Sequence, residues 1–157
     1  MPRLYIMCGI PASGKSTFAR KLVENNNNIC YVSRDEIRFS IIKNDEDYFS
    51  REKEVFKKFV ITIAENLKVG HDVIADATHL NHFSRGKLIR AIDQYITNYT
   101  IEYVVLTTPL EICMERNATR EWRARVPDSV MKSMAENFEY ITNEEKNSER
   151  VRVIYYV

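Results

Sequence analysis

The stretch that decides the fold reads Gly9-Ile10-Pro11-Ala12-Ser13-Gly14-Lys15-Ser16-Thr17. An apolar run at residues 4–8 precedes it and indicates a buried strand. Residues 17–23 follow it with apolar side chains at helical spacing, which indicates a helix. Residues 9–17 also fit the pattern G-x-x-x-x-G-K-[ST] without a mismatch. The motif and its strand–turn–helix context together predict a phosphate-binding loop, or P-loop.

The residue types of this loop suit a nucleoside triphosphate such as ATP. Glycine lets the backbone approach the phosphates, and N–H groups at the start of the helix face them. We expect Lys15 to contact the β- and γ-phosphates and the Ser16 hydroxyl to bind Mg²⁺. A simple glycine turn is the alternative. The predicted ATP-binding residues of the loop are Gly9, Pro11, Ala12, Ser13, Gly14, Lys15, Ser16 and Thr17.

Length and composition predict one compact α/β domain over residues 1–157, because 45% of the 157 residues are hydrophobic. The formal net charge of +1 does not by itself predict a nucleic-acid partner. The three cysteines are scattered through apolar segments without metal-ligand spacing, which favours a reducing compartment. No signal peptide or membrane-spanning run is visible, so we expect a cytoplasmic protein.

Strands and helices are predicted to alternate along the whole chain. The predicted strands are residues 4–8, 29–32, 71–76, 101–106 and 151–157. Long helices are expected over residues 45–69, 84–96 and 127–141. This alternation predicts a P-loop NTPase fold, with a parallel central sheet, helices on both faces and the functional loops at one edge. We interpret Tyr48 and Phe49 as part of the apolar core stripe of the 45–69 helix.

Two strand ends carry further candidates for the site. Asp35 and Arg38 lie three residues apart at the start of a helix, directly after the second strand, and therefore share a face. A role of Asp35 in capping that helix is the alternative, which we consider weaker. Asp76 ends the third strand and is a candidate for the Mg²⁺ shell, or equally a turn-forming residue. His79 and His82 follow in a loop and are expected to be solvated.

An arginine-rich segment at about residues 116–127 is a candidate lid over the nucleotide. Permanently charged guanidinium groups suit phosphate oxygens. The alternative is a solvated helix face paired with glutamates. Trp122 could stack on a base or anchor the lid. The arginines of this segment are Arg116, Arg120, Arg123 and Arg125.

Several of these pieces together resemble the phage-type polynucleotide 5′-hydroxyl kinases, including the kinase domain of bifunctional end-healing enzymes. The resemblance covers nearly the whole chain. The R-D-x-x-R piece and the R-N-x-x-R piece before a Val-Pro helix start are more specific than the P-loop. The resembling pieces are residues 9–20, 33–38, 76–81, 116–120 and 126–134.

The resemblance implies a role for each matching position, with ATP as donor, Mg²⁺ as cofactor and 5′-hydroxyl DNA or RNA ends as acceptor. It implies that Lys15 and Ser16 bind the phosphates and Mg²⁺, and that Asp35 is the general base. Arg38 would hold the phosphate on the 3′ side of the terminal nucleotide. Arg120 would contact the donor phosphates with support from Arg116. The positions implied near the terminal nucleoside of the acceptor are Thr78, Val126 and Val130.

The chain departs from the family pattern in two places. Ala77 stands where the best-known phage enzymes have a carboxylate, and Asp76 lies one residue earlier. The lid is also one residue longer, which favours Arg120 over Arg123 or Arg125. The paired-aspartate phosphatase motif is absent, so any 3′-phosphatase or ligase step is expected from a separate protein.

The predicted function is an ATP-dependent polynucleotide 5′-hydroxyl kinase. Two alternatives remain: a small-molecule alcohol kinase on the same scaffold, and a nucleotide-dependent switch ATPase whose only acceptor is water. The sequence leaves open DNA against RNA, single strand against duplex end, and the oligomeric state.

Overall fold

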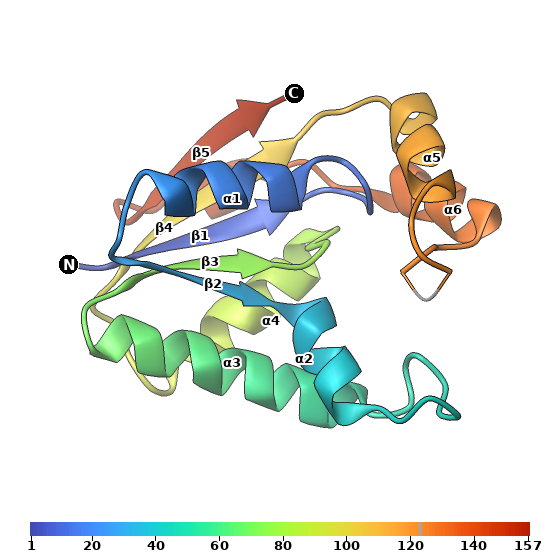
Figure 1. The fold of residues 1–157 in the computed structure, drawn as a ribbon. Helices are drawn as coiled ribbons and strands as arrows, with labels where there is room; N and C mark the ends of the chain where they lie inside the picture. Colours follow the sequence, from blue (N-terminus) through green and yellow to red (C-terminus); the bar gives the residue numbers. More distant parts are fainter. Residues whose placement is uncertain (123) are drawn as a thin grey trace.

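Five parallel strands form the centre of the molecule in a computed structural model, which describes residues 1–122 and 124–157. The strand order is β2-β3-β1-β4-β5, and every neighbouring pair is parallel (Figure 1). The strands are β1 (Arg3–Cys8), β2 (Ile29–Ser33), β3 (Asp72–Asp76), β4 (Thr100–Leu106) and β5 (Val151–Tyr156). The parallel α/β P-loop fold predicted from the sequence is confirmed.

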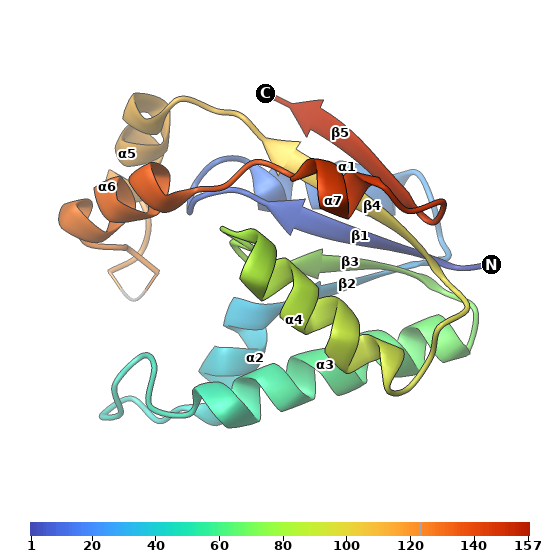
Figure 2. The same ribbon diagram turned by 180° about the vertical axis from the view of Figure 1, so that it is seen from behind.

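Helices cover both faces of this sheet, as Figures 1 and 2 show from opposite sides. Successive residues of a strand point to opposite faces, so Tyr5 and Met7 pack under α1, while Leu4 and Ile6 pack under α3 and α4. Burial on both faces explains why β1 is apolar from Leu4 to Cys8. The helices are α1 (Lys15–Glu24), α2 (Arg34–Ile41), α3 (Glu52–Lys68), α4 (His82–Asp93), α5 (Leu110–Ala118), α6 (Asp128–Asn137) and α7 (Asn143–Lys146).

The loops that carry the predicted site residues follow the carboxyl ends of the strands. Met7 of β1 and Ser33 of β2 are both register partners of Asp76 in β3, so these three strands end level with one another. In Figures 1 and 2 the loop between α2 and α3 lies on one side of this edge, and α5 and α6 lie on the other. A small apolar cluster of Ile10, Cys113 and Met131 joins α5 and α6 to the P-loop.

The predicted helix over residues 45–69 is wrong at its start, because α3 begins at Glu52. Residues 43–51 instead form turns. The backbone N–H of Lys43 donates to Glu46 Oε1 at 3.0 Å, and Arg51 Nε donates to Glu46 Oε2 at 2.9 Å. The interpretation of Tyr48 and Phe49 as core is therefore wrong, since both side chains are exposed beside the carboxyl edge.

Two further expectations are corrected nearer the end of the chain. The helix predicted over residues 127–141 ends at Asn137, and the short helix α7 follows it with a capping box between Thr142 and Glu145. His79 is buried rather than solvated, because its ring stacks on Phe59 and its Nδ1 lies 2.6 Å from the carbonyl oxygen of Met7. His82 is exposed and pairs with Glu139.

Cys8, Cys30 and Cys113 are free thiols, and Cys8 and Cys113 are buried. Within residues 1–122 and 124–157, no helix is long and apolar enough to cross a bilayer.

Candidate active-site cleft

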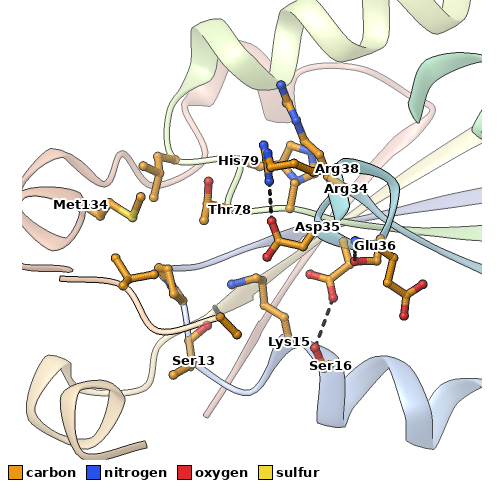
Figure 3. A pocket seen from close by; sticks show the side chains of 18 of the residues that line it. Ser13, Lys15, Ser16, Arg34, Asp35, Glu36, Arg38, Thr78, His79 and Met134 are labelled. Carbon is orange, nitrogen blue, oxygen red and sulfur yellow. Dashed lines mark hydrogen bonds and ion pairs between the residues drawn. The ribbon is translucent and has the colours of Figure 1, made fainter. Parts of the chain in front are cut away.

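A cleft of about 1260 Å³ lies along the carboxyl edge of the sheet. Its walls come from the P-loop, the start of α2, the loop after β3 and the segment from α5 to α6. Figure 3 shows Lys15 from the P-loop and Asp35 and Arg38 from α2 pointing into this one space. Every predicted site residue lines the cleft except Gly9, the buried first residue of the P-loop. The lining set is Pro11, Ala12, Ser13, Gly14, Lys15, Ser16, Thr17, Asp35, Arg38, Asp76, Thr78, Arg116, Arg120, Val126 and Val130.

Glycine is required at two positions of the P-loop for different reasons. Gly14 has a φ of 102°, a left-handed conformation that a residue with a Cβ rarely adopts. A Cβ on Gly9 would lie 2.6 Å from Ser13 Oγ and 3.1 Å from Leu106 Cβ, so the loop can close tightly only over glycine. The loop is held from outside as well, because Thr108 Oγ1 donates to the carbonyl of Ser13 at 2.8 Å.

Lys15 supplies a buried positive charge inside the loop. Its ammonium donates to the carbonyl oxygens of Gly9 at 2.9 Å and Ile10 at 2.8 Å. Burial lowers the pKa of Lys15, while the nearby carboxylates of Asp76 and Asp35 act in the opposite direction. Two neutral carbonyls compensate a buried ammonium only in part, so an anion such as a phosphate would be a stronger partner.

Ser16, Asp76 and Tyr31 form a short chain of hydrogen bonds beside Lys15. Ser16 Oγ donates to Asp76 Oδ2 at 3.4 Å, and the Tyr31 hydroxyl donates to the same carboxylate oxygen. Burial and the adjacent Asp76 charge raise the pKa of Tyr31, which keeps it a hydrogen-bond donor. Asp76 is buried although it is ionisable.

The oxygens of Ser16 and Asp76 fit a Mg²⁺ ion, which prefers hydroxyl and carboxylate ligands. In the described part of the chain, no group of three or more His, Cys, Asp or Glu side chains is placed to hold a metal. A Mg²⁺ bound here would therefore take its other ligands from phosphates and water, as is usual in nucleotide sites.

Asp35 and Arg38 meet as the sequence predicts, and two unpredicted residues hold them. Arg38 Nη1 donates to Asp35 Oδ1 at 2.5 Å, while its Nε and Nη2 donate to Glu52 at 2.8 and 3.2 Å. The Tyr48 hydroxyl donates to Asp35 Oδ1 at 2.6 Å and accepts from Arg38 Nη1 at 2.8 Å. Arg34 also donates to Glu52, at 2.9 Å. Glu52 thus fixes the orientation of Arg38.

The polar run before Tyr48 was the sequence signal for this arrangement. Residues 43–47 contain Asn44, Asp45 and Asp47, which favour turns over a helix interior. That run breaks the apparent helix and leaves Tyr48 free to reach Asp35. No local signal pointed to Glu52, because its partners lie on another helix.

The lid candidates lie on the far side of the cleft from α2. Arg116 Nη1 lies 3.4 Å from the carbonyl of Ala12 in the P-loop, and Arg120 lines the cleft. Asn117 holds Val126 by two hydrogen bonds, at 2.6 and 3.0 Å. Trp122 is 83% exposed and does not line the cleft. Arg123 lies outside the described residues.

The remaining acceptor candidate, Thr78, is tied directly to the P-loop, since its carbonyl accepts from the N–H of Gly9 at 2.9 Å. Thr78 comes from the loop after β3, and Val130 comes from α6. The structure therefore brings the predicted donor-side and acceptor-side residues to one cleft from four segments of the chain.

Comparison with known proteins gives three kinds of match. The family model AAA_33, described as an AAA domain, matches residues 4–141. The L-seryl-tRNA(Sec) kinase of Methanococcus maripaludis is 31% identical over 142 residues, which cover 87% of this chain and 52% of that protein. This chain thus spans about half the length of that curated relative.

Solved structures share the fold. A chain of the Pnkp1/Rnl/Hen1 RNA repair complex has a TM-score of 0.75 and 27% identity, with 95% of this chain and 47% of that chain covered. A sugar kinase of Janibacter sp. HTCC2649 has a TM-score of 0.68 and 17% identity, with 99% and 86% covered. At 17% identity, the sugar kinase shows a common fold and nothing about substrate.

Proposed function

This chain belongs to the AAA_33 family of AAA domains, and we propose that it is an ATP-dependent kinase that phosphorylates 5′-hydroxyl ends of DNA or RNA. One observation carries the proposal. The carboxylate of Asp35 and the guanidinium of Arg38 line the same cleft as the P-loop ammonium of Lys15. A donor site, a proton acceptor and an anion clamp are the parts that phosphoryl transfer to an alcohol requires.

The proposed mechanism assigns each charge a task. Lys15 and Arg120 stabilise the negative charge on the transferred phosphoryl group. Asp35 orients the attacking hydroxyl in line with the bond that breaks and accepts its proton. Ser16 and Asp76 would hold Mg²⁺, which would supply further charge neutralisation at the phosphates. Arg116, bonded to the P-loop carbonyl of Ala12, keeps the lid side of the cleft close to the donor.

Arg38 argues for an acceptor that carries a negative charge as well as a hydroxyl. A switch ATPase with water as its acceptor has no need of an anion clamp beside its base. In a polynucleotide, the nucleoside with the 5′-hydroxyl also carries a phosphate on its 3′ side, whereas a neutral sugar carries no phosphate. Thr78, Val126 and Val130 then lie around the terminal nucleoside. The likeness to a chain of an RNA repair complex supports this choice. The sequence-based expectation of a separate ligase or 3′-phosphatase as partner is part of the same proposal.

A second candidate acceptor is a hydroxyl carried on an aminoacylated RNA. The relative at 31% identity is a kinase of L-seryl-tRNA(Sec), and serine presents a primary alcohol like that of a 5′ end. The same donor site, base and clamp would serve either acceptor.

Transfer of labelled γ-phosphate from ATP to a panel of acceptors tests the proposal. The panel holds 5′-hydroxyl DNA and RNA oligonucleotides, their 5′-phosphorylated counterparts, seryl-tRNA, and small alcohols including sugars. We expect label on the 5′-hydroxyl oligonucleotides and none on the 5′-phosphorylated ones. Label only on seryl-tRNA would favour the second candidate. Label only on small alcohols, or ATP hydrolysis alone, would overturn the nucleic-acid proposal.

A further inference from the structure

The loop between α2 and α3 presents two aromatic side chains at the acceptor end of the cleft. Phe49 is 64% exposed and Tyr48 is 37% exposed, and both line the cleft. Phe83 on α4 is similarly exposed, at 67%, but does not line it. An exposed phenyl ring forgoes the stabilisation of burial, so its position in a binding cleft calls for a ligand with an apolar or aromatic face.

Tyr48 fixes the position of Phe49 relative to the proposed base. The Tyr48 hydroxyl bonds to Asp35 at 2.6 Å, and its ring lies 4.3 Å from the guanidinium carbon of Arg38. The ring of Phe49 packs edge-on against Tyr48, with centroids 4.6 Å apart and an interplanar angle of 84°. The loop that carries both rings is closed by bonds from Lys43 and Arg51 to Glu46. The exposed ring is therefore held in place.

Tyr48 joins the proposed base to the exposed ring, since its hydroxyl bonds to Asp35 and its ring packs against Phe49. A nucleoside whose 5′-hydroxyl binds Asp35 beside Tyr48 would therefore have its base near the Phe49 ring. Arg38, whose Cζ is 5.7 Å from the Phe49 centroid, lies where the next phosphate would follow.

We infer that Phe49, supported by Tyr48, is the platform on which the terminal base of the acceptor stacks. This inference rests on the proposed function and deepens it, because it makes a planar base part of what the enzyme recognises. Stacking is tolerant of sequence, since every base has an aromatic face. A small sugar has no such face, so the platform selects nucleic-acid ends over small alcohols.

Binding of a fluorescent base analogue tests the inference without requiring turnover. The probe is a 5′-hydroxyl oligonucleotide with 2-aminopurine as its terminal base, whose fluorescence is quenched by stacking. We expect quenching with the wild-type protein and with Phe83→Leu, the matched exposed control. Phe49→Leu keeps an apolar side chain but removes the aromatic face. It should abolish the quenching and raise the Kd about tenfold, as expected for the loss of one stacked base.

Acceptor kinetics provide a second readout. Phe49→Leu should raise the KM for an oligonucleotide with a terminal base about tenfold, and should leave the KM for one with a terminal abasic site within twofold. Equal quenching and equal KM values for Phe49→Leu and wild type would overturn the platform while the proposed function stands. A wild-type protein that neither binds nor phosphorylates the oligonucleotide would overturn both.

Discussion

Single residues of the cleft differ in whether their charge is already balanced. Arg38 is surrounded by Glu52 and Asp35, so it is oriented by the protein before any acceptor arrives. Lys15 donates its hydrogen bonds to the carbonyl oxygens of Gly9 and Ile10, which balance its charge only in part and leave it available for phosphates. Such pre-orientation lowers the cost of organising charges during phosphoryl transfer.

Tyr31 is expected to position the metal site through Asp76. Tyr31→Phe removes the hydroxyl that bonds the Asp76 carboxylate and should raise the Mg²⁺ concentration for half-maximal transfer about tenfold. Most of the lost activity should return at saturating Mg²⁺. Activity is titrated with Mg²⁺ for this variant and for Tyr95→Phe, an exposed tyrosine outside the cleft. Identical Mg²⁺ titration curves for the two variants would show that Tyr31 does not position the metal site.

His79 should make the fold sensitive to acid. Burial lowers the pKa of His79 from its usual 6.5 to about 4, so it stays neutral in the fold at a pH where the unfolded chain is protonated. The resulting stability is present above pH 6.5 and is lost as the pH falls toward 4, by about 2–3 kcal/mol at pH 4.5.

The matched variant is His79→Asn, because asparagine tolerates the φ of 45° found at this position. Urea denaturation at pH 7 and pH 4.5 gives the change in unfolding free energy for each protein. The unfolding free energy should fall less between pH 7 and pH 4.5 in His79→Asn than in the wild type, by about 2–3 kcal/mol. Equal decreases would mean that His79 does not contribute.

At the scale of elements, α4 and α7 are joined to the cleft by one buried ion pair. Arg85 of α4 is fully buried and donates to Glu145 of α7 at 2.8 and 3.2 Å. The same guanidinium donates to the carbonyl of His79, 2.9 Å away in the loop after β3. One side chain therefore fixes two helices and the loop that carries Thr78.

Arg85→Ala leaves the Glu145 carboxylate and several carbonyls without their partner. We expect it to lower the unfolding free energy by about 3–5 kcal/mol. Arg90→Ala, on the exposed side of the same helix, should change it by no more than about 0.5 kcal/mol. Chemical denaturation of both variants measures the difference. A similar small effect for both would show that the buried pair is dispensable.

Local sequence pattern was sufficient to predict some elements of the candidate site and failed for others. The P-loop and the Asp35–Arg38 pair were predictable, because strand ends in a parallel sheet must meet at one edge. Tyr48 and Phe49 were misassigned because apolar spacing extended the helical pattern through a turn. The buried His79 was missed since its partners, Phe59 and Met7, lie far away in the sequence. Contacts between distant elements leave no local pattern.

At the scale of the whole molecule, nucleotide binding should stabilise the fold because the P-loop connects β1 to α1 at its centre. A non-hydrolysable ATP analogue with Mg²⁺, at one hundred times its Kd, should raise the unfolding free energy by about 2.7 kcal/mol. Lys15→Met should lose most of this gain at the same ligand concentration. Thermal or chemical denaturation with and without the analogue measures this gain in stability. A gain in Lys15→Met equal to that of the wild type would contradict phosphate binding by Lys15.

We propose that one cleft brings a nucleotide donor and a hydroxyl acceptor together at Asp35. The most direct test is the rate of γ-phosphate transfer to a 5′-hydroxyl oligonucleotide by wild type and Asp35→Asn, with ATP binding measured in parallel. We predict that Asp35→Asn binds ATP as the wild type does but transfers phosphate at least about a hundredfold more slowly. Transfer by Asp35→Asn at a rate within a few fold of wild type would contradict it.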